Sequence, residues 1–290
     1  MNARLRRTAA GFAAVCILLA GCGNTGVDSV TVNTGEAAAL IRQTFTDRLE
    51  TAELSFTAGK LGQEEVVSIV EDMVQAAFYE SDDPKGGDYL RFQYGGYELS
   101  YTAGKGLIDH TYDVTIVPSY YTTKEEEDRV DERIAEVISG FGLDKGASEH
   151  EKIRCVYDFI CGNTSYDTVH KHMPGSRHYQ STAYGALIYK TALCQGYSVL
   201  AYRLLKELGI AARIVTGTFG TGEDQERHSW NIVGIDGIFY NLDVTMGDAK
   251  STDAYYLKSD DDIASDHIRD EIYKTDEFMA EYPMSKESYT

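Results

Sequence analysis

A two-residue turn between two apolar segments constrains the fold of this chain more than any other feature. Asp236-Gly237 separates residues 228–235 from residues 238–243, and both segments have the composition of β-strands. Asp-Gly favours a two-residue hairpin turn, because that turn needs positive φ at both central positions. The turn fixes the register of the predicted strands and places Trp230 opposite Asp243.

This register also brings His228 close to Asp243. His228 lies two residues before Trp230, on the same face of its strand. Diagonal neighbours across an antiparallel pair are about 7–8 Å apart, which an imidazole–carboxylate hydrogen bond can span. Taken singly, a histidine on a strand is usually structural, and an aspartate at a strand end is usually a turn or cap residue. Together they form the base and orienting group of a catalytic triad if a nucleophile lies nearby.

Cys194 is a nucleophile of the right kind. It precedes an apolar stripe at helical spacing, residues 197–208, which ends at Gly209. The unpaired N–H groups and the dipole of a first helical turn favour an anion, and so bias this thiol towards thiolate. A buried cysteine without chemistry is the simpler interpretation of Cys194 alone. Its occurrence in one ordered set with His228 and Asp243 indicates a thiol enzyme.

The residues around this set resemble a known family. Between Glu151 and Asp253 the chain contains EKIRCVYDFICGNTSYD, TAYGALIYKTALCQGYSVLAYRLLKELGIAARIVTG and HSWNIVGIDGIFYNLDVTMGDA. This stretch resembles the transglutaminase-like superfamily, and YYLKSDDDIASDHIRDE resembles the closing segment of that family. The resemblance implies a papain-like cysteine-hydrolase core with Cys194 as nucleophile, His228 as general base and acid, and Asp243 as orienting carboxylate. Met246 departs from the pattern, because relatives often have tryptophan there.

The expected function is a thiol hydrolase, either a peptidase or an isopeptidase, that acts on peptide amides without cofactor or metal. The backbone N–H of Cys194 would hold the oxyanion, and Gln180 and Tyr184 are the candidates for the second donor. A protein-glutamine transglutaminase that cross-links envelope proteins remains an alternative, because it uses the same triad. A non-enzymatic envelope binding module on the same fold is the other. Hydrolysis is favoured, since cross-linking requires a site that excludes water.

A metal site has weaker support. His170 and His172 form an H-x-H pattern with His178 nearby, but no carboxylate or cysteine stands at ligand spacing. We therefore expect this stretch to be a loop that faces the substrate.

The start of the chain is typical of an export signal. Three arginines precede an apolar run, residues 9–20, which is too short to span a bilayer as a mature helix. Leu19-Ala20-Gly21-Cys22 resembles the bacterial lipoprotein signal, in which cleavage follows lipidation of the cysteine thiol. An ordinary secretory signal with a chance cysteine is the alternative. The lipoprotein interpretation predicts a protein anchored to the cell membrane through Cys22, on the extracytoplasmic side, with a peptide or protein substrate in the cell envelope.

Charge and composition limit the remaining possibilities. The net charge of −19 argues against nucleic acid as a partner, and 43% hydrophobic residues indicate a globular chain. The predicted class is α+β, with a papain-like or transglutaminase-core catalytic domain behind a small α/β accessory region. In the accessory region, Gly95-Gly96 is predicted to be the turn of a hairpin. The expected segments are a signal peptide at 1–21, a tether at 22–34, the accessory region at 35–120 and the catalytic domain at 121–290.

Overall fold

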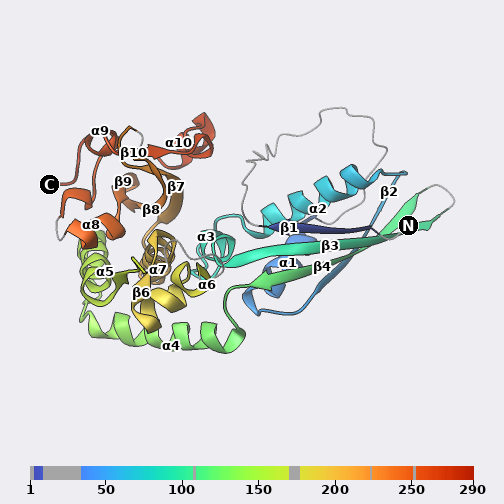
Figure 1. Ribbon diagram of the computed structural model, residues 1–290, viewed down its shortest axis with the longest axis horizontal. Helices are drawn as coiled ribbons and strands as arrows, with labels where there is room; N and C mark the ends of the chain where they lie inside the picture. The colour runs from blue at the N-terminus through green and yellow to red at the C-terminus, as the bar shows by residue number, and fades with distance from the viewer. Residues whose placement is uncertain (1–2, 9–33, 107–108, 170–176, 223, 251–252) are drawn as a thin grey trace. The chain divides into compact units, whose positions relative to one another are not determined.

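The structure is a computed structural model that describes residues 3–8, 34–106, 109–169, 177–222, 224–250 and 253–290 (Figure 1). These residues form two compact units. The first combines Met1–Glu80 with Tyr94–Tyr120, and the second combines Ser81–Gln93 with Tyr121–Thr290. The second unit therefore includes Ser81–Gln93, a segment of the expected accessory region.

The first unit contains a four-stranded antiparallel sheet in the order β1-β3-β4-β2. Its elements are β1 (Ala3–Thr8), α1 (Thr34–Thr46), β2 (Ala52–Ala58), α2 (Gln63–Ala77), β3 (Tyr94–Lys105) and β4 (His110–Tyr120). The apolar stripe of α2 is buried, as its spacing predicts, and α2 packs against α1. β1 lies within the expected signal peptide and pairs with β3, so cleavage before Cys22 would remove this strand and leave β3 at the sheet edge.

The predicted turn at Gly95-Gly96 is wrong. Both glycines lie within β3, where the register with β4 shifts between Tyr94 and Gly96, and Gly96 has φ of 117°. A glycine pair in a strand accommodates a bulge as readily as a turn. The hairpin is instead closed between Lys105 and His110. Leu90, which the expected hairpin would place in its first strand, instead lies in the short helix α3 (Gly87–Arg91) of the second unit.

The second unit contains an antiparallel sheet in the order β10-β7-β8-β9 and a short parallel pair, β5-β6. Besides α3, its helices and strands are α4 (Lys124–Gly140), α5 (Glu149–Asn163), β5 (Ser165–Tyr166), α6 (Arg177–Gln180), a π-helix η1 (Gly185–Tyr189), β6 (Thr191–Ala192), α7 (Cys194–Glu207), β7 (Ala212–Phe219), β8 (Glu226–Ile235), β9 (Ile238–Leu242), α8 (Val244–Lys250), η2 (Asp253–Tyr255), α9 (Asp260–Ile263), β10 (His267–Arg269), η3 (Glu271–Tyr273) and α10 (Asp276–Glu281).

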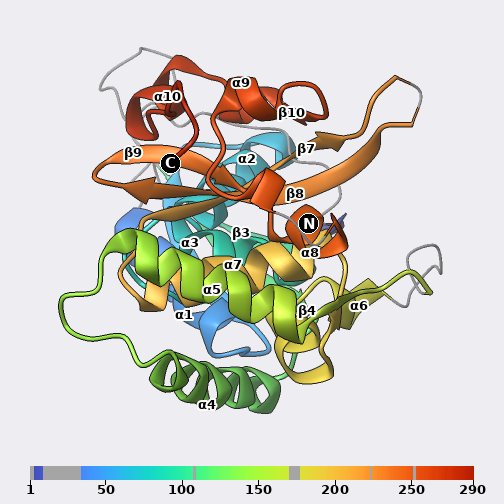
Figure 2. The ribbon, with the colours of Figure 1, turned by 90° about the vertical axis from the view of Figure 1, so that its left-hand side faces the viewer.

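Helix α7 is the centre of this unit. It lies behind α5 in the view of Figure 2 and contacts α5, β7, β8 and α8. Its residues from Gly196 to Leu205 are buried. The predicted hairpin is confirmed, because Ile235 pairs with Ile238 and both Asp236 and Gly237 have positive φ. The first turn of α7 lies next to strand β8 of the hairpin. The candidate site lies where these two elements meet.

Among the described residues, no helix is both long and apolar enough to cross a membrane. Leu19-Ala20-Gly21-Cys22 and the H-x-H pattern of His170 and His172 lie outside the described residues.

Candidate active site

Cys194 is the first residue of α7, and several contacts fix this helix start. The N–H of Leu193 donates to the carbonyl oxygen of Gln180 at 2.8 Å. Gly196 lies so close to the same carbonyl that an added Cβ would stand 2.5 Å from it. Ser198 Oγ is 2.9 Å from the carbonyl oxygens of both Cys194 and Ser229, which ties the first turn of α7 to β8.

His228 and Asp243 form the hydrogen bond that the hairpin register predicts. His228 Nε2 and Asp243 Oδ2 are 2.7 Å apart, and both residues are buried. The His228 ring is stacked on Trp230, with ring centroids 5.9 Å apart and an angle of 18° between the planes. Since Nε2 is bonded to Asp243, Nδ1 is the ring nitrogen left to face Cys194.

Cys194 and His228 are hydrogen-bonded through their side chains, and each changes the acidity of the other. Burial opposes ionisation of the Cys194 thiol, but the hydrogen bond and charge of His228 outweigh it and lower its pKa. Burial also opposes protonation of His228, but the charge of Asp243 and the bonds to Asp243 and Cys194 raise its pKa to about 10. Both shifts favour a thiolate–imidazolium pair at neutral pH.

Asp243 is held ionised and in one orientation. Burial would raise its pKa, but the charge and hydrogen bond of His228, together with His267, keep it well below its usual value. Its Oδ1 accepts a hydrogen bond from the backbone N–H of Met246 at 3.0 Å. Because this contact uses the backbone, the departure from the family pattern at Met246 leaves it intact.

His267 is the site residue that the sequence analysis missed. Its Nε2 is 2.9 Å from Asp243 Oδ2, the same oxygen that binds His228, and its Nδ1 is 2.7 Å from Asp266 Oδ1. It lies on β10, which pairs with β7 and places His267 opposite Phe219. The only signal was its position in the segment that resembles the end of the family, and no spacing rule connects that segment to Asp243.

The two candidates for a second oxyanion donor have different surroundings. Tyr184 Oη accepts a hydrogen bond from Arg129 at 2.6 Å, and its ring packs against Tyr179 and Tyr189. These contacts place the Tyr184 side chain in a cluster that does not include Cys194. They do not support a role for Tyr184 in binding the oxyanion.

Gln180 lies next to the start of α7, as its contacts with Leu193 and Gly196 show. Its side-chain Oε1 is buried and has no hydrogen-bond partner among the described residues. Gln180 therefore remains the candidate for the second oxyanion donor.

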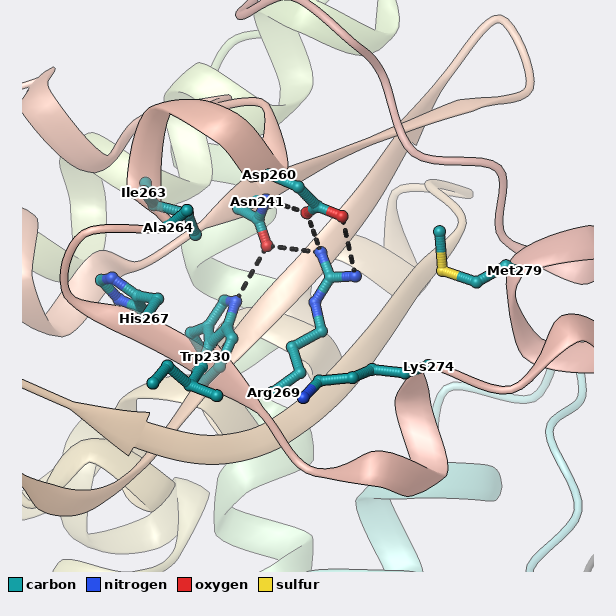
Figure 3. Close-up of a pocket in the computed structure, with 10 residues that line it drawn as sticks. Trp230, Asn241, Asp260, Ile263, Ala264, His267, Arg269, Lys274 and Met279 are labelled. Atoms are coloured by element: carbon teal, nitrogen blue, oxygen red, sulfur yellow. Dashed lines mark hydrogen bonds and ion pairs between the residues drawn. The ribbon is translucent and has the colours of Figure 1, made fainter.

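Two cavities lie around the cluster. The smaller, of about 170 Å³, includes His228 in its wall; its other lining residues are Tyr166, Phe219, Glu226, Arg227, Thr245, Met246 and Ala249. The larger, of about 400 Å³, is lined by His267 and Trp230 but by neither Cys194 nor His228 (Figure 3). Its polar groups bind one another, since Asn241 Oδ1 accepts from both Trp230 Nε1 and Arg269. The smaller cavity is thus the better candidate for a substrate site.

His228, Asp243 and His267 are also residue types that bind metal ions, and their ligand atoms lie within 4.8 Å of one another. Here, however, both Nε2 atoms lie within hydrogen-bond distance of the single oxygen Oδ2. An ion bound by all three would have to replace both of these bonds. We therefore interpret the cluster as a hydrogen-bonded chain.

Part of this chain matches a known protein family. Residues 140–244 match the family model of the Transglutaminase-like superfamily. This confirms the resemblance and the predicted α+β class with a transglutaminase-like core. Members of this superfamily are typically cysteine-dependent enzymes. No match to a curated protein was found.

Several solved structures are distantly similar. One is a TGase, with 20% identity, a TM-score of 0.38 and coverage of 50% of this chain and 43% of the other. A candidate cysteine protease from Cytophaga hutchinsonii has 17% identity, a TM-score of 0.33 and coverage of 51% and 56%. A candidate protease from Parabacteroides distasonis has 14% identity, a TM-score of 0.29 and coverage of 50% and 35%. This chain thus spans less than two thirds of each of these proteins, and likenesses at such TM-scores carry no argument about its activity.

Proposed function

We propose that this protein is a thiol hydrolase, a peptidase or isopeptidase, that cleaves peptide amides with Cys194, His228 and Asp243. One observation carries the proposal. Hydrogen bonds connect the Cys194 thiol to His228 and His228 to Asp243, at the start of a buried helix. A nucleophile, a base and a group that fixes the base are the parts that acyl transfer requires.

In the first half of the reaction, the Cys194 thiolate adds to the carbonyl carbon of the amide. The backbone N–H of Cys194, unpaired within the first turn of α7, donates to the oxyanion that forms. The side-chain amide of Gln180 is the second donor in this proposal. The C–N bond then breaks, His228 gives its proton to the leaving nitrogen, and a thioester remains on Cys194.

In the second half, His228 accepts a proton from water, and the hydroxyl oxygen adds to the thioester carbonyl. The C–S bond breaks and releases a carboxylic acid, and Cys194 returns as a thiolate beside protonated His228. Asp243 keeps Nε2 of His228 protonated, so the proton that moves in both halves is the one on Nδ1.

We also propose where this activity takes place, from the signal-like sequence that ends at Cys22. A lipid on Cys22 and the tether at 22–34 would hold the protein at the extracytoplasmic face of the cell membrane, in reach of envelope peptides and proteins. The substrate is therefore proposed to be an envelope peptide or protein, and the membrane is contacted through the lipid.

Trapping of the acylated enzyme tests this function. The purified protein is mixed with an envelope extract in H₂¹⁸O with EDTA present, quenched in acid, and digested for mass spectrometry. We expect an acyl group on Cys194, its absence in Cys194→Ser, and ¹⁸O in the released carboxylate. Transfer of the acyl group to an added amine without ¹⁸O uptake would instead establish a transglutaminase. The absence of any acyl group would contradict the proposed enzyme.

A further inference from the structure

Asp243 Oδ2 accepts hydrogen bonds from two imidazoles, but the proposed triad uses only one of them. His228 Nε2 is 2.7 Å away and His267 Nε2 is 2.9 Å away. The His267 side chain is 1% exposed, and its ring packs against Trp230 at 5.0 Å and Phe219 at 5.1 Å. His267 does not line the smaller cavity proposed for the substrate, and its Nε2 is directed at the triad carboxylate.

Both ring nitrogens of His267 face carboxylates. Nε2 faces Asp243, and Nδ1 is 2.7 Å from Asp266 Oδ1. An ionised carboxylate only accepts hydrogen bonds, so a ring nitrogen of His267 can bond to either carboxylate only as a donor. Asp266 is fixed in turn, because its Oδ2 accepts from Tyr255 Oη at 2.7 Å and Tyr255 Oη accepts from Lys250 Nζ at 2.6 Å.

The resulting hydrogen-bonded chain runs from the surface to the nucleophile. Lys250, Asp266, His267, Asp243 and His228 follow one another, with the Tyr255 hydroxyl between the first two. Within it, the ionised Asp243 and the protonated His228 are neighbours of opposite sign, which is the condition for burying charges without a large penalty. The chain ends at the Cys194 thiolate.

We infer that His267 is a positioning residue that shares Asp243 Oδ2 with His228 and so limits how tightly His228 holds its proton. This inference deepens the proposed thiol hydrolase and rests on it. A carboxylate oxygen that accepts two strong hydrogen bonds is a weaker acceptor for each, and a general acid must give up its proton near ambient pH. With Met246 N–H on Oδ1, the shared bond also prevents the carboxylate from rotating.

Proton NMR of the imidazole N–H groups tests the inference without a substrate. Strong hydrogen bonds to carboxylates shift these protons downfield and slow their exchange with water. In His267→Phe the aromatic packing is kept, but one donor is lost, so the His228 Nε2 proton should move further downfield and exchange more slowly. If this signal keeps its position, Oδ2 is not shared in the way we infer and the inference is overturned.

Two further variants separate this role from a structural one. Asp266→Asn keeps the shape of the chain but removes the charge that supports His267, so the His228 signal should move in the same direction by a smaller amount, even if His267→Phe does not fold. His150→Phe is the matched control, because His150 also packs between aromatic rings, Tyr289 and Tyr256, and should leave the signal unchanged.

Activity supplies the second readout. His267→Phe should lower kcat about tenfold or more, the effect of losing one charged hydrogen bond, with KM unchanged because His267 does not touch substrate. A raised KM with unchanged kcat would contradict the positioning role. Because the NMR measurement needs no turnover, a shifted His228 signal without any acyl-enzyme would reject the proposed function and leave the shared hydrogen bond standing.

Discussion

Asp88 and Arg213 form a buried, two-point ion pair across 125 positions of the chain. Arg213 Nε is 2.8 Å from Asp88 Oδ2, and Nη2 is 3.2 Å from Oδ1. Asp88 Oδ2 also accepts from the backbone N–H of Ile214 at 2.8 Å. Asp88 lies on α3 and Arg213 on β7, so this pair joins the segment Ser81–Gln93 to the sheet that carries His228.

Removal of Asp88 should therefore destabilise the second unit. Asp88→Ala leaves the buried Arg213 without this carboxylate, and breaking a buried pair costs about 3–5 kcal/mol in the free energy of unfolding. Urea unfolding measures the loss. Asp128→Ala, which breaks an exposed pair with Lys124, should change the free energy of unfolding by less than about 1 kcal/mol.

A fragment of residues 121–290 lacks Asp88 and should therefore be less stable than the full chain. Equal stability would contradict the assignment of Ser81–Gln93 to this unit.

The Asp88–Arg213 pair also predicts how the free energy of unfolding depends on pH. Burial opposes ionisation of Asp88, but the charges of Arg213 and Arg91 and the hydrogen bonds outweigh it and lower its pKa. A carboxyl group whose pKa is lower in the folded protein than in the unfolded chain, where it is about 3.9, stabilises the fold above that pH. This stabilisation is lost as the pH falls below about 3.9. The free energy of unfolding should fall between pH 6 and pH 3, and by less in Asp88→Asn. An equal fall in both proteins would show that other groups cause it.

In our proposal, membrane attachment depends on Cys22. Cys22→Ala should move the protein from the membrane fraction to the soluble fraction, because a lipid on Cys22 is the proposed anchor. Fractionation with immunoblotting measures this, and circular dichroism of the purified variant should match that of the unmodified protein. Full retention in the membrane fraction would contradict lipid anchoring at Cys22.

Asp243→Asn should keep the fold and lower turnover by orders of magnitude, about 10³–10⁴-fold. A neutral amide neither stabilises the charged His228 nor fixes its proton on Nε2. Release of product from an envelope peptide measures kcat, and thermal unfolding checks the fold. A variant that stays folded and keeps most of its turnover would remove Asp243 from the proposed mechanism.

The parts of the site that could be predicted from sequence are those set by local rules. The turn at Asp236-Gly237 fixes the pairing of β8 with β9, and this register alone brings His228 to Asp243. The apolar stripe of α7 places Cys194 in a first helical turn. These relations span at most one helix or one hairpin, so the residue pattern contains them.

The parts that could not be predicted depend on contacts between distant segments. His267 reaches Asp243 because β10 adds to the edge of the sheet beside β7, after a connection of short helices and loops whose path no periodicity defines. Leu90, Phe92 and Tyr94 alternate with polar residues as in a strand, but Gly87–Arg91 form a helix whose Asp88 binds Arg213. In both cases tertiary contacts decide the outcome over local preference.

The pH dependence of cysteine alkylation tests the central claim most directly. The thiols of Cys155, Cys161 and Cys194 are all free, so one protein supplies its own controls. Burial, with nearby acidic groups, raises the pKa of Cys155 and raises that of Cys161 to about 12, whereas His228 lowers that of Cys194.

Iodoacetamide labelling followed by mass spectrometry should therefore modify Cys194 well below the pH near 8.5 at which a free thiol ionises, and ahead of Cys155 and Cys161. His228→Ala should remove most of the labelling at mildly acidic pH. Labelling of Cys194 no faster than Cys155 in the native protein, and unchanged in His228→Ala, would contradict the thiol enzyme and leave a binding module on the same fold.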